Sequence, residues 1–249
     1  MPGVVKVLLP GQNKMQYQNI YSLIPVLILA VSPSLIWLFF YLKEDPHPEP
    51  RLWIFIIFIM GVALAPIVIF LEMTLNIWGN GVLIFIIAPL VEEAAKYGVV
   101  HLSLNKNPVL NEPVDGMIYV IVAALGFAAI ENVFAIFSFI PVGSYGYLNA
   151  TLNFMSMRFI SAVALHGLAS GIAGYYFSRF YFMERNPILI FKGLFFASSL
   201  HGVYNFLIMR NEGSYYIILI GFVLGAVAAL VIYLFNRLKH YKAYQEVKI

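Results

Sequence analysis

Long apolar segments constrain this chain more than any other feature of its sequence. A helix that crosses a bilayer needs about 20 mostly apolar residues, and about seven segments of this kind occur here. Breaks rich in Pro, Gly, Asn and charged residues separate them. The segments are residues 20–42, 52–71, 82–102, 114–137, 157–181, 188–209 and 215–234. The pattern predicts an all-α fold, a polytopic bundle of transmembrane helices.

Composition supports the same class. Of the 249 residues, 61% are hydrophobic and only 11% are charged, whereas soluble domains carry about 25% charged residues. We therefore expect one integral membrane domain over residues 1–249 and no soluble domain. The chain has no cysteine, which excludes thiolate catalysis and Cys-ligated metals. Its N-terminal segment lacks the apolar core and cleavage site of a signal peptide, so none is expected.

The distribution of Lys and Arg predicts the orientation in the cell membrane. The first, third and fifth loops and the C-terminal tail carry most of these residues: Lys43, Arg51, Lys106, Arg179, Arg185, Lys192, Arg237, Lys239, Lys242 and Lys248. The opposite side carries only Lys6, Lys14, Arg158 and Arg210. We expect the C-terminus in the cytoplasm and the N-terminus outside, with Arg158 as an anchor near the outer surface.

Polar and ionisable residues interrupt the third to sixth apolar segments. Such groups are costly at bilayer depth and therefore mark functional sites. They are Glu92, Glu93 and Lys96 on the third segment, Glu131 and Asn132 on the fourth, His166 on the fifth, and His201 and Asn205 on the sixth. These residues are our candidates for catalysis, and they place a catalytic four-helix core in residues 82–209.

Four of these candidates are expected at one depth. Glu92, Glu131, His166 and His201 each lie roughly 8–10 residues, or about 12–15 Å, from the outer end of their segment. Lys96 shares a helix face with both glutamates of the third segment and can neutralise one of them. The two glutamates point in directions about 100° apart, which predicts different roles. Glu92 is our candidate base, and the adjacent carboxylate orients another group or binds metal.

Glutamates and histidines that converge in a low-dielectric pocket can activate water. Two chemistries stay open: a metal-free glutamic mechanism, and zinc or another divalent metal held by Glu131, His166 and His201 with one glutamate left as base. An aspartyl pair is absent from the spans, and so is the H-E-x-x-H motif. A serine mechanism through Ser170 leaves the glutamates without a role.

Two other classes of function also fit buried Glu and His residues. One is a proton- or cation-coupled transporter that uses them as a relay. It predicts inverted repeats, which the sequence does not show. The other is a non-catalytic scaffold with a vestigial pocket, which does not explain the retention of the whole polar set. We therefore favour an enzyme that hydrolyses peptide bonds in or beside the membrane.

The ordered motifs resemble those of the PrsW-family intramembrane proteases. They are E-E-x-x-K (Glu92, Glu93, Lys96), F-x-x-x-E-N (Phe127, Glu131, Asn132), the single His166, and H-x-x-x-N (His201, Asn205), with P-V-D-G at residues 113–116. The resemblance covers residues 83–207. The wider superfamily includes the CAAX prenyl endopeptidases and Abi proteins, which tend to have a His where this chain has Glu131-Asn132.

The resemblance implies an activity and a class of partner. It implies an intramembrane endopeptidase that cleaves a membrane-anchored protein in or near its transmembrane segment. In this family the implied substrate is an anti-sigma factor, cut at site one during regulated proteolysis in a stress response. The implied partners are therefore a membrane protein and the lipid bilayer, with no nucleic acid.

Overall fold

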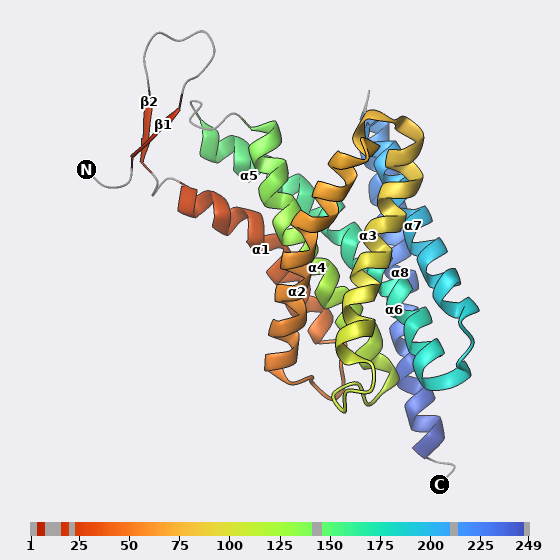
Figure 1. The fold of residues 1–249 in the computed structure, drawn as a ribbon. Helices are drawn as coiled ribbons and strands as arrows, with labels where there is room; N and C mark the ends of the chain where they lie inside the picture. Colours follow the sequence, from red (N-terminus) through yellow and green to blue (C-terminus); the bar gives the residue numbers. More distant parts are fainter. Residues whose placement is uncertain (1–3, 8–15, 20–22, 141–145, 210–213, 247–249) are drawn as a thin grey trace.

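The computed structural model describes residues 4–7, 16–19, 23–140, 146–209 and 214–246, and Figure 1 shows a bundle of long helices. In chain order the elements are β1 (Val4–Val7), β2 (Gln16–Asn19), α1 (Leu23–Leu42), α2 (Arg51–Thr74), the 3-10 turn η2 (Ile77–Gly79), α3 (Gly81–Leu104), α4 (Pro113–Phe139), α5 (Tyr147–Arg158), the π-helical turn η3 (Phe159–Val163), α6 (Ala164–Ser178), the π-helical turn η4 (Arg179–Glu184), α7 (Ile188–Met209) and α8 (Ser214–Glu246). The predicted all-α membrane bundle is confirmed, apart from a short antiparallel β1–β2 hairpin that was not predicted.

Helix α4 lies at the centre of the bundle and packs against α1, α2 and α6 (Figure 1). It is buried over most of its length because its residues are almost all apolar and many are small. A Cβ on Gly126 would lie 2.1 Å from the backbone oxygen of Phe58, and a Cβ on Gly61 would lie 2.1 Å from that of Ala123. The α2 and α4 backbones therefore touch directly, as small residues allow in membrane bundles.

A second close contact joins α3 to α7. A Cβ on Gly202 of α7 would lie 2.1 Å from the backbone oxygen of Phe85 on α3. Asn205, one turn further along α7, donates from Nδ2 to the backbone oxygen of Ile84 at 3.4 Å. These contacts fix α7 beside α3, and so they bring the polar residues of the two helices within reach of each other.

Five helical segments are long and apolar enough to cross a membrane: α1, α2, α4, the continuous segment Tyr147–Glu184, and Ile217–Tyr241 within α8. Helices α3 and α7 have 24 and 22 residues, which is also enough to span the bilayer. They are less apolar because they carry the polar candidates. The protein is a multi-pass membrane protein, and the count of seven spans stays a prediction.

The predicted loop at residues 140–151 is wrong over its second half. Residues 141–145 lie outside the described part of the chain, and α5 begins at Tyr147. Its polar side chains are compatible with a helix because they bond to the turn before them: Thr151 Oγ1 donates to the Tyr147 oxygen at 2.8 Å, and Ser156 Oγ to the Leu152 oxygen at 2.8 Å. Helix α8 also continues past the predicted end at residue 234.

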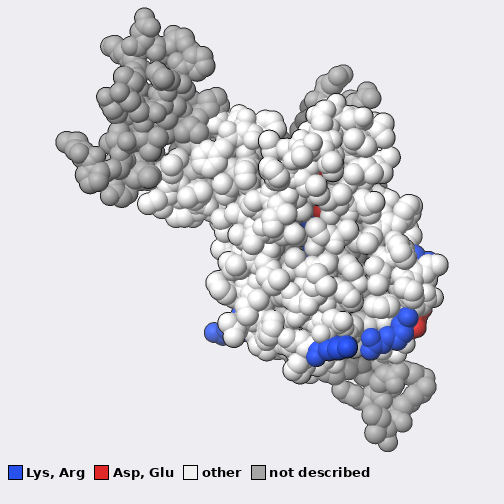
Figure 2. All heavy atoms as spheres, in the orientation of Figure 1, with Lys and Arg blue, Asp and Glu red and all other residues white. Residues whose placement is uncertain are grey.

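The charge distribution on the face drawn in Figure 2 is uneven. Lys and Arg gather at its lower end, where Figure 1 places the α1–α2, α3–α4 and η4–α7 loops. Most of the face is uncharged, as lipid contact requires, but a small hollow in its upper half shows acidic and basic atoms. Lys14, Arg210 and Lys248, which contribute to the predicted orientation, lie outside the described residues.

Candidate active site

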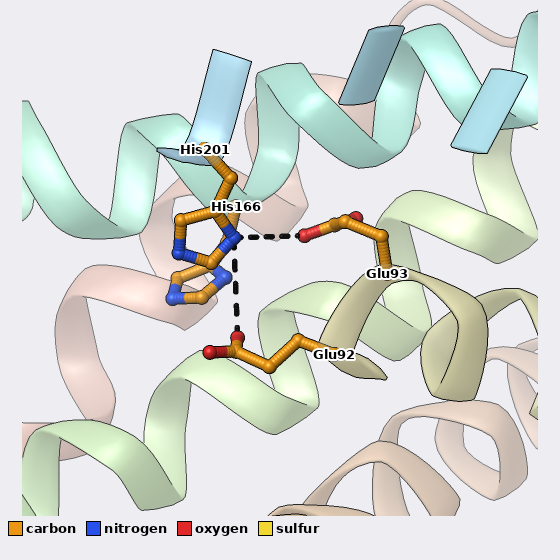
Figure 3. A group of neighbouring side chains, drawn as sticks. All are labelled: Glu92, Glu93, His166 and His201. Carbon is orange, nitrogen blue, oxygen red and sulfur yellow. Dashed lines mark hydrogen bonds and ion pairs between the residues drawn. The ribbon is translucent and has the colours of Figure 1, made fainter. Parts of the chain in front are cut away.

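Four candidate side chains meet between α3, α6 and α7 (Figure 3). Each of Glu92, Glu93, His166 and His201 is buried and offers one ligand atom, and these four atoms all lie within 4.8 Å of one another. His201 Nδ1 lies 3.2 Å from Glu93 Oε1 and 4.0 Å from Glu92 Oε2. The two imidazole rings are nearly perpendicular, with centroids 5.1 Å apart. The structure thus brings together residues that are up to 109 positions apart in the chain.

Lys96 provides the positive charge inside this group. Its side chain is fully buried, and Nζ donates to Glu93 Oε1 at 2.7 Å and to Glu92 Oε2 at 3.2 Å. The same nitrogen lies 3.0 Å from His166 Nδ1 and 4.6 Å from the centre of the Phe127 ring. The i,i+3 and i,i+4 spacings allow both contacts, whereas only one of the two glutamates was predicted to be neutralised.

Glu131 extends the cluster towards the surface. Its Oε2 lies 2.5 Å from His166 Nε2, and its Oε1 lies 3.2 Å from Arg158 Nη2. Arg158 Nε also donates to Asn132 Oδ1 at 2.6 Å, and Asn132 Nδ2 donates to the Ala30 oxygen at 3.0 Å. The interpretation of Arg158 as an interfacial anchor is therefore wrong, because this cation bonds to the site.

The two adjacent glutamates are bonded differently. Both oxygens of Glu93 are engaged: Oε1 contacts Lys96 and His201, and Oε2 accepts from Ser170 Oγ at 2.8 Å. Among the described residues, Glu92 is bonded only through Oε2, and its side chain is 9% exposed whereas that of Glu93 is fully buried. Glu93 is therefore held in place, while Glu92 keeps one oxygen available for water or substrate.

Two further residues at the site were not among the candidates. Ser170 was considered only as a nucleophile, but it orients Glu93. Glu72 on α2 is 1% exposed, accepts from Trp78 Nε1 at 3.2 Å, and interacts electrostatically with Glu92. Its Oε1 is buried and has no hydrogen-bond partner among the described residues. An acidic residue just past the end of an apolar segment was the signal in the sequence. Asn205, by contrast, bonds to the α3 backbone and not to the cluster.

The donor atoms at this site fit a divalent metal. Two imidazole nitrogens and one or two carboxylates form a common ligand set for zinc. The surroundings contain four carboxylates and two cations: Glu72, Glu92, Glu93 and Glu131 with Lys96 and Arg158. With neutral histidines their formal charge is about −2, and one divalent ion balances that charge. Glu131, which was predicted as a ligand, bonds instead to the far nitrogen of His166, where a carboxylate orients a metal-binding imidazole.

A buried cluster of Glu and His residues inside a bundle of apolar helices is the arrangement expected of a membrane-embedded hydrolase. Comparison with known proteins gives the family. Residues 49–235 match the family described as PrsW family intramembrane metalloprotease, and the chain belongs to this family. It is 32% identical over 208 residues to the protease PrsW of Clostridioides difficile, which covers 79% of this chain and 84% of that relative.

Other relatives agree. The protease PrsW of Geobacillus kaustophilus is 29% identical over 190 residues (74% of this chain and 79% of the relative), and that of Bacillus subtilis is 26% identical over 190 residues (74% and 82%). No solved structure matches the fold. The protein is thus an intramembrane protease, and the transporter alternative is set aside.

Proposed function

We propose that the chain hydrolyses a peptide bond of a membrane-anchored protein at the cluster of Glu92, Glu93, His166 and His201, with a divalent metal held there. The convergence of four ligand atoms from three helices within 4.8 Å carries this proposal. Zinc fits the two imidazoles and the carboxylates best. When bound, it supplies a Lewis acid that polarises the scissile carbonyl and activates water.

Glu92 is the proposed general base. It has one oxygen without a partner in the described residues, and it lies on the slightly exposed side of the pair. A carboxylate in this position accepts the proton of the attacking water and returns it to the leaving amine. Glu93 cannot take this part without losing its bonds to Lys96 and Ser170, so we assign it to orientation and metal binding.

The remaining residues stabilise and align these groups. His201 places Nδ1 3.2 Å from Glu93 Oε1 and 4.0 Å from Glu92 Oε2, so this nitrogen would be its metal ligand. Lys96 balances the carboxylate charge when the cluster is closed to water. Asn132 and Arg158 hold Glu131 against His166. Asn205 positions α7 on α3, a supporting part in catalysis.

We further propose that the substrate is a membrane-anchored anti-sigma factor, as the family resemblance implies. Substrate reaches the site past Glu131, whose side chain is 29% exposed and which borders the otherwise buried cluster. The gathering of Lys and Arg at one end of the molecule supports a cytoplasmic C-terminus and an external N-terminus in the cell membrane.

Metal content is the first test of the mechanism. The full chain, purified in detergent, should contain about one zinc per molecule, lose cleavage of a membrane-tethered substrate on chelation, and regain it when zinc is added back. A metal-free preparation with full activity that resists chelation would contradict the metal proposal and favour the glutamic mechanism.

Variants separate the roles of the glutamates. Glu92→Gln should keep the metal, held by the three remaining ligands Glu93, His166 and His201, but lose cleavage by about 10²–10⁴-fold, the usual contribution of a general base. Glu93→Gln should weaken both metal binding and cleavage. Glu184→Gln is the matched control, since Glu184 pairs with Arg179 at the partly exposed end of η4. Full activity of Glu92→Gln in reconstituted vesicles would rule out its assignment as base.

A further inference from the structure

A second group of buried acidic residues lies far from the active site. It joins the α1–α2 loop, which contributes Asp45 and Glu49, to the start of α4, which contributes Glu112 and Asp115. Asp115 and Glu131 are sixteen residues apart on α4, about 24 Å at the usual helical rise. The group is therefore separate from the proposed catalytic cluster.

In Asp45 and Asp115, one carboxylate oxygen accepts hydrogen bonds from backbone nitrogens and the other does not. Asp115 Oδ2 accepts from the backbone nitrogens of Asn111 and Glu112 at 2.8 and 2.7 Å, and Asp45 Oδ1 accepts from the backbone nitrogen of His47 at 2.9 Å. Asp45 is 6% exposed and Asp115 is fully buried. The second oxygen of Asp45, Oδ2, is buried without a hydrogen-bond partner among the described residues, and the second oxygen of Asp115, Oδ1, is buried near the carboxyl group of Glu49. Such an orphaned buried acceptor requires an explanation.

The local charge is strongly negative. Among the described residues, no Lys or Arg forms an ion pair with Asp45, Glu49 or Asp115. His47 Nδ1 lies 3.1 Å from Glu112 Oε1 but is mostly exposed. Burial raises the pKa of Asp45 and of Glu49 above the ordinary values, and neighbouring carboxylates add to this. Carboxylates this close repel one another, and a cation would relieve the repulsion.

The spacing fits one shared ion. A ligand oxygen from each of Asp45, Glu112 and Asp115 lies within 4.8 Å of the other two. The largest separation between two oxygens bound to one ion is that of oxygens on opposite sides. It is about 4.6–5.2 Å for Ca²⁺ and about 4.0–4.2 Å for Mg²⁺. Oxygens within 4.8 Å of one another can share an ion of either size. An all-carboxylate set selects hard cations over zinc.

We propose that Asp45, Glu112 and Asp115 form a second metal site, which binds a hard divalent cation such as Ca²⁺. The ion fastens the α1–α2 loop to the N-terminal end of α4. It thereby holds the central helix, on which Glu131 lies, against the loop that precedes α2. Glu49 completes the negative surroundings, and its Oε2 accepts from Tyr119 at 2.6 Å.

Terbium luminescence tests this site directly, because Tb³⁺ replaces Ca²⁺ and is sensitised by a nearby tyrosine such as Tyr119. The full chain in detergent, stripped with chelator, is titrated with Tb³⁺ and then with Ca²⁺ or Mg²⁺. Wild-type protein should bind one Tb³⁺ that Ca²⁺ displaces at lower concentration than Mg²⁺. Asp45→Asn should weaken binding by about tenfold or more, since affinity follows the count of ligand charges.

The active-site variant Glu92→Gln serves as the control and should leave the luminescence titration unchanged. If Asp45→Asn does not fold, Glu49→Gln and the wild-type titration still decide the matter. No sensitised Tb³⁺ binding and no Ca²⁺-dependent rise in melting temperature in the wild type would overturn the proposal. Binding that Glu92→Gln abolishes and Asp45→Asn preserves would also overturn it, because the ion would then lie in the active site.

Discussion

Removal of the Lys96 charge should destabilise the protein more than any surface change. Its Nζ lies 2.7 Å from Glu93 Oε1 and 3.2 Å from Glu92 Oε2. At an effective dielectric constant of about 20, these contacts correspond to gross attractions of about 6 and 5 kcal/mol. Desolvation offsets much of this, but loss of one partner leaves buried carboxylates without compensation. We therefore expect Lys96→Met to lower the free energy of unfolding by about 3–5 kcal/mol.

The assay is reversible unfolding of the full chain in mixed micelles, followed by circular dichroism. The double variant Glu93→Gln/Lys96→Met should be less destabilised than Lys96→Met, because one uncompensated charge is then absent. Glu184→Gln, which removes only a partly exposed ion pair, should cost no more than about 1 kcal/mol. A loss below about 1 kcal/mol in Lys96→Met would refute the assignment of this lysine as the buried countercharge.

Three more outcomes are expected. Gly126→Ala should destabilise the α2–α4 contact by about 1–3 kcal/mol, measured by the same unfolding assay, while Gly225→Ala, with nothing within 4 Å of its Cβ position, should not. Ser170→Ala should reduce cleavage of the tethered substrate by about 10–100-fold through loss of a bond to a charged group; complete loss with normal metal content would instead indicate a nucleophile. In this cysteine-free chain, the single variant Lys43→Cys should react with an impermeant maleimide only after the membrane is opened, and Leu75→Cys should react in intact cells; the reverse pattern would invert the proposed orientation.

Local patterns were sufficient for the helices that cross the membrane. Residues 52–71 are apolar throughout, and in residues 114–137 only Asp115, Glu131 and Asn132 are strongly polar. No other structure satisfies the backbone of such segments in lipid, and α2 and α4 cover both ranges. The same reasoning failed at residues 147–151. There Asn and Thr suggested a loop, but hydroxyl bonds to the preceding turn are compatible with a helix.

The polar candidates were also visible from the sequence, because charge is rare inside apolar segments. The spacing of Lys96 predicted a helix face shared with Glu92 and Glu93 and one ion pair, and the structure has two. The partnership of Arg158 with Glu131 was not predictable in this way. It depends on the path of the long Tyr147–Glu184 segment past α4, which no local spacing encodes.

The sequence by itself determined the membrane class, most of the helices, the family and most residues of the candidate site. These follow from residue types and from periodicity within single helices. Only the tertiary structure decided which side chains bond to one another. In the candidate active site, Glu93 is bonded at both oxygens while Glu92 keeps one available. In the second acidic group, Asp45 of a loop lies near Asp115 of α4. The reason is physical. Helix geometry specifies which side chains share a face, but contacts between helices depend on packing, such as the close approach at Gly202, that involves residues distant in the chain.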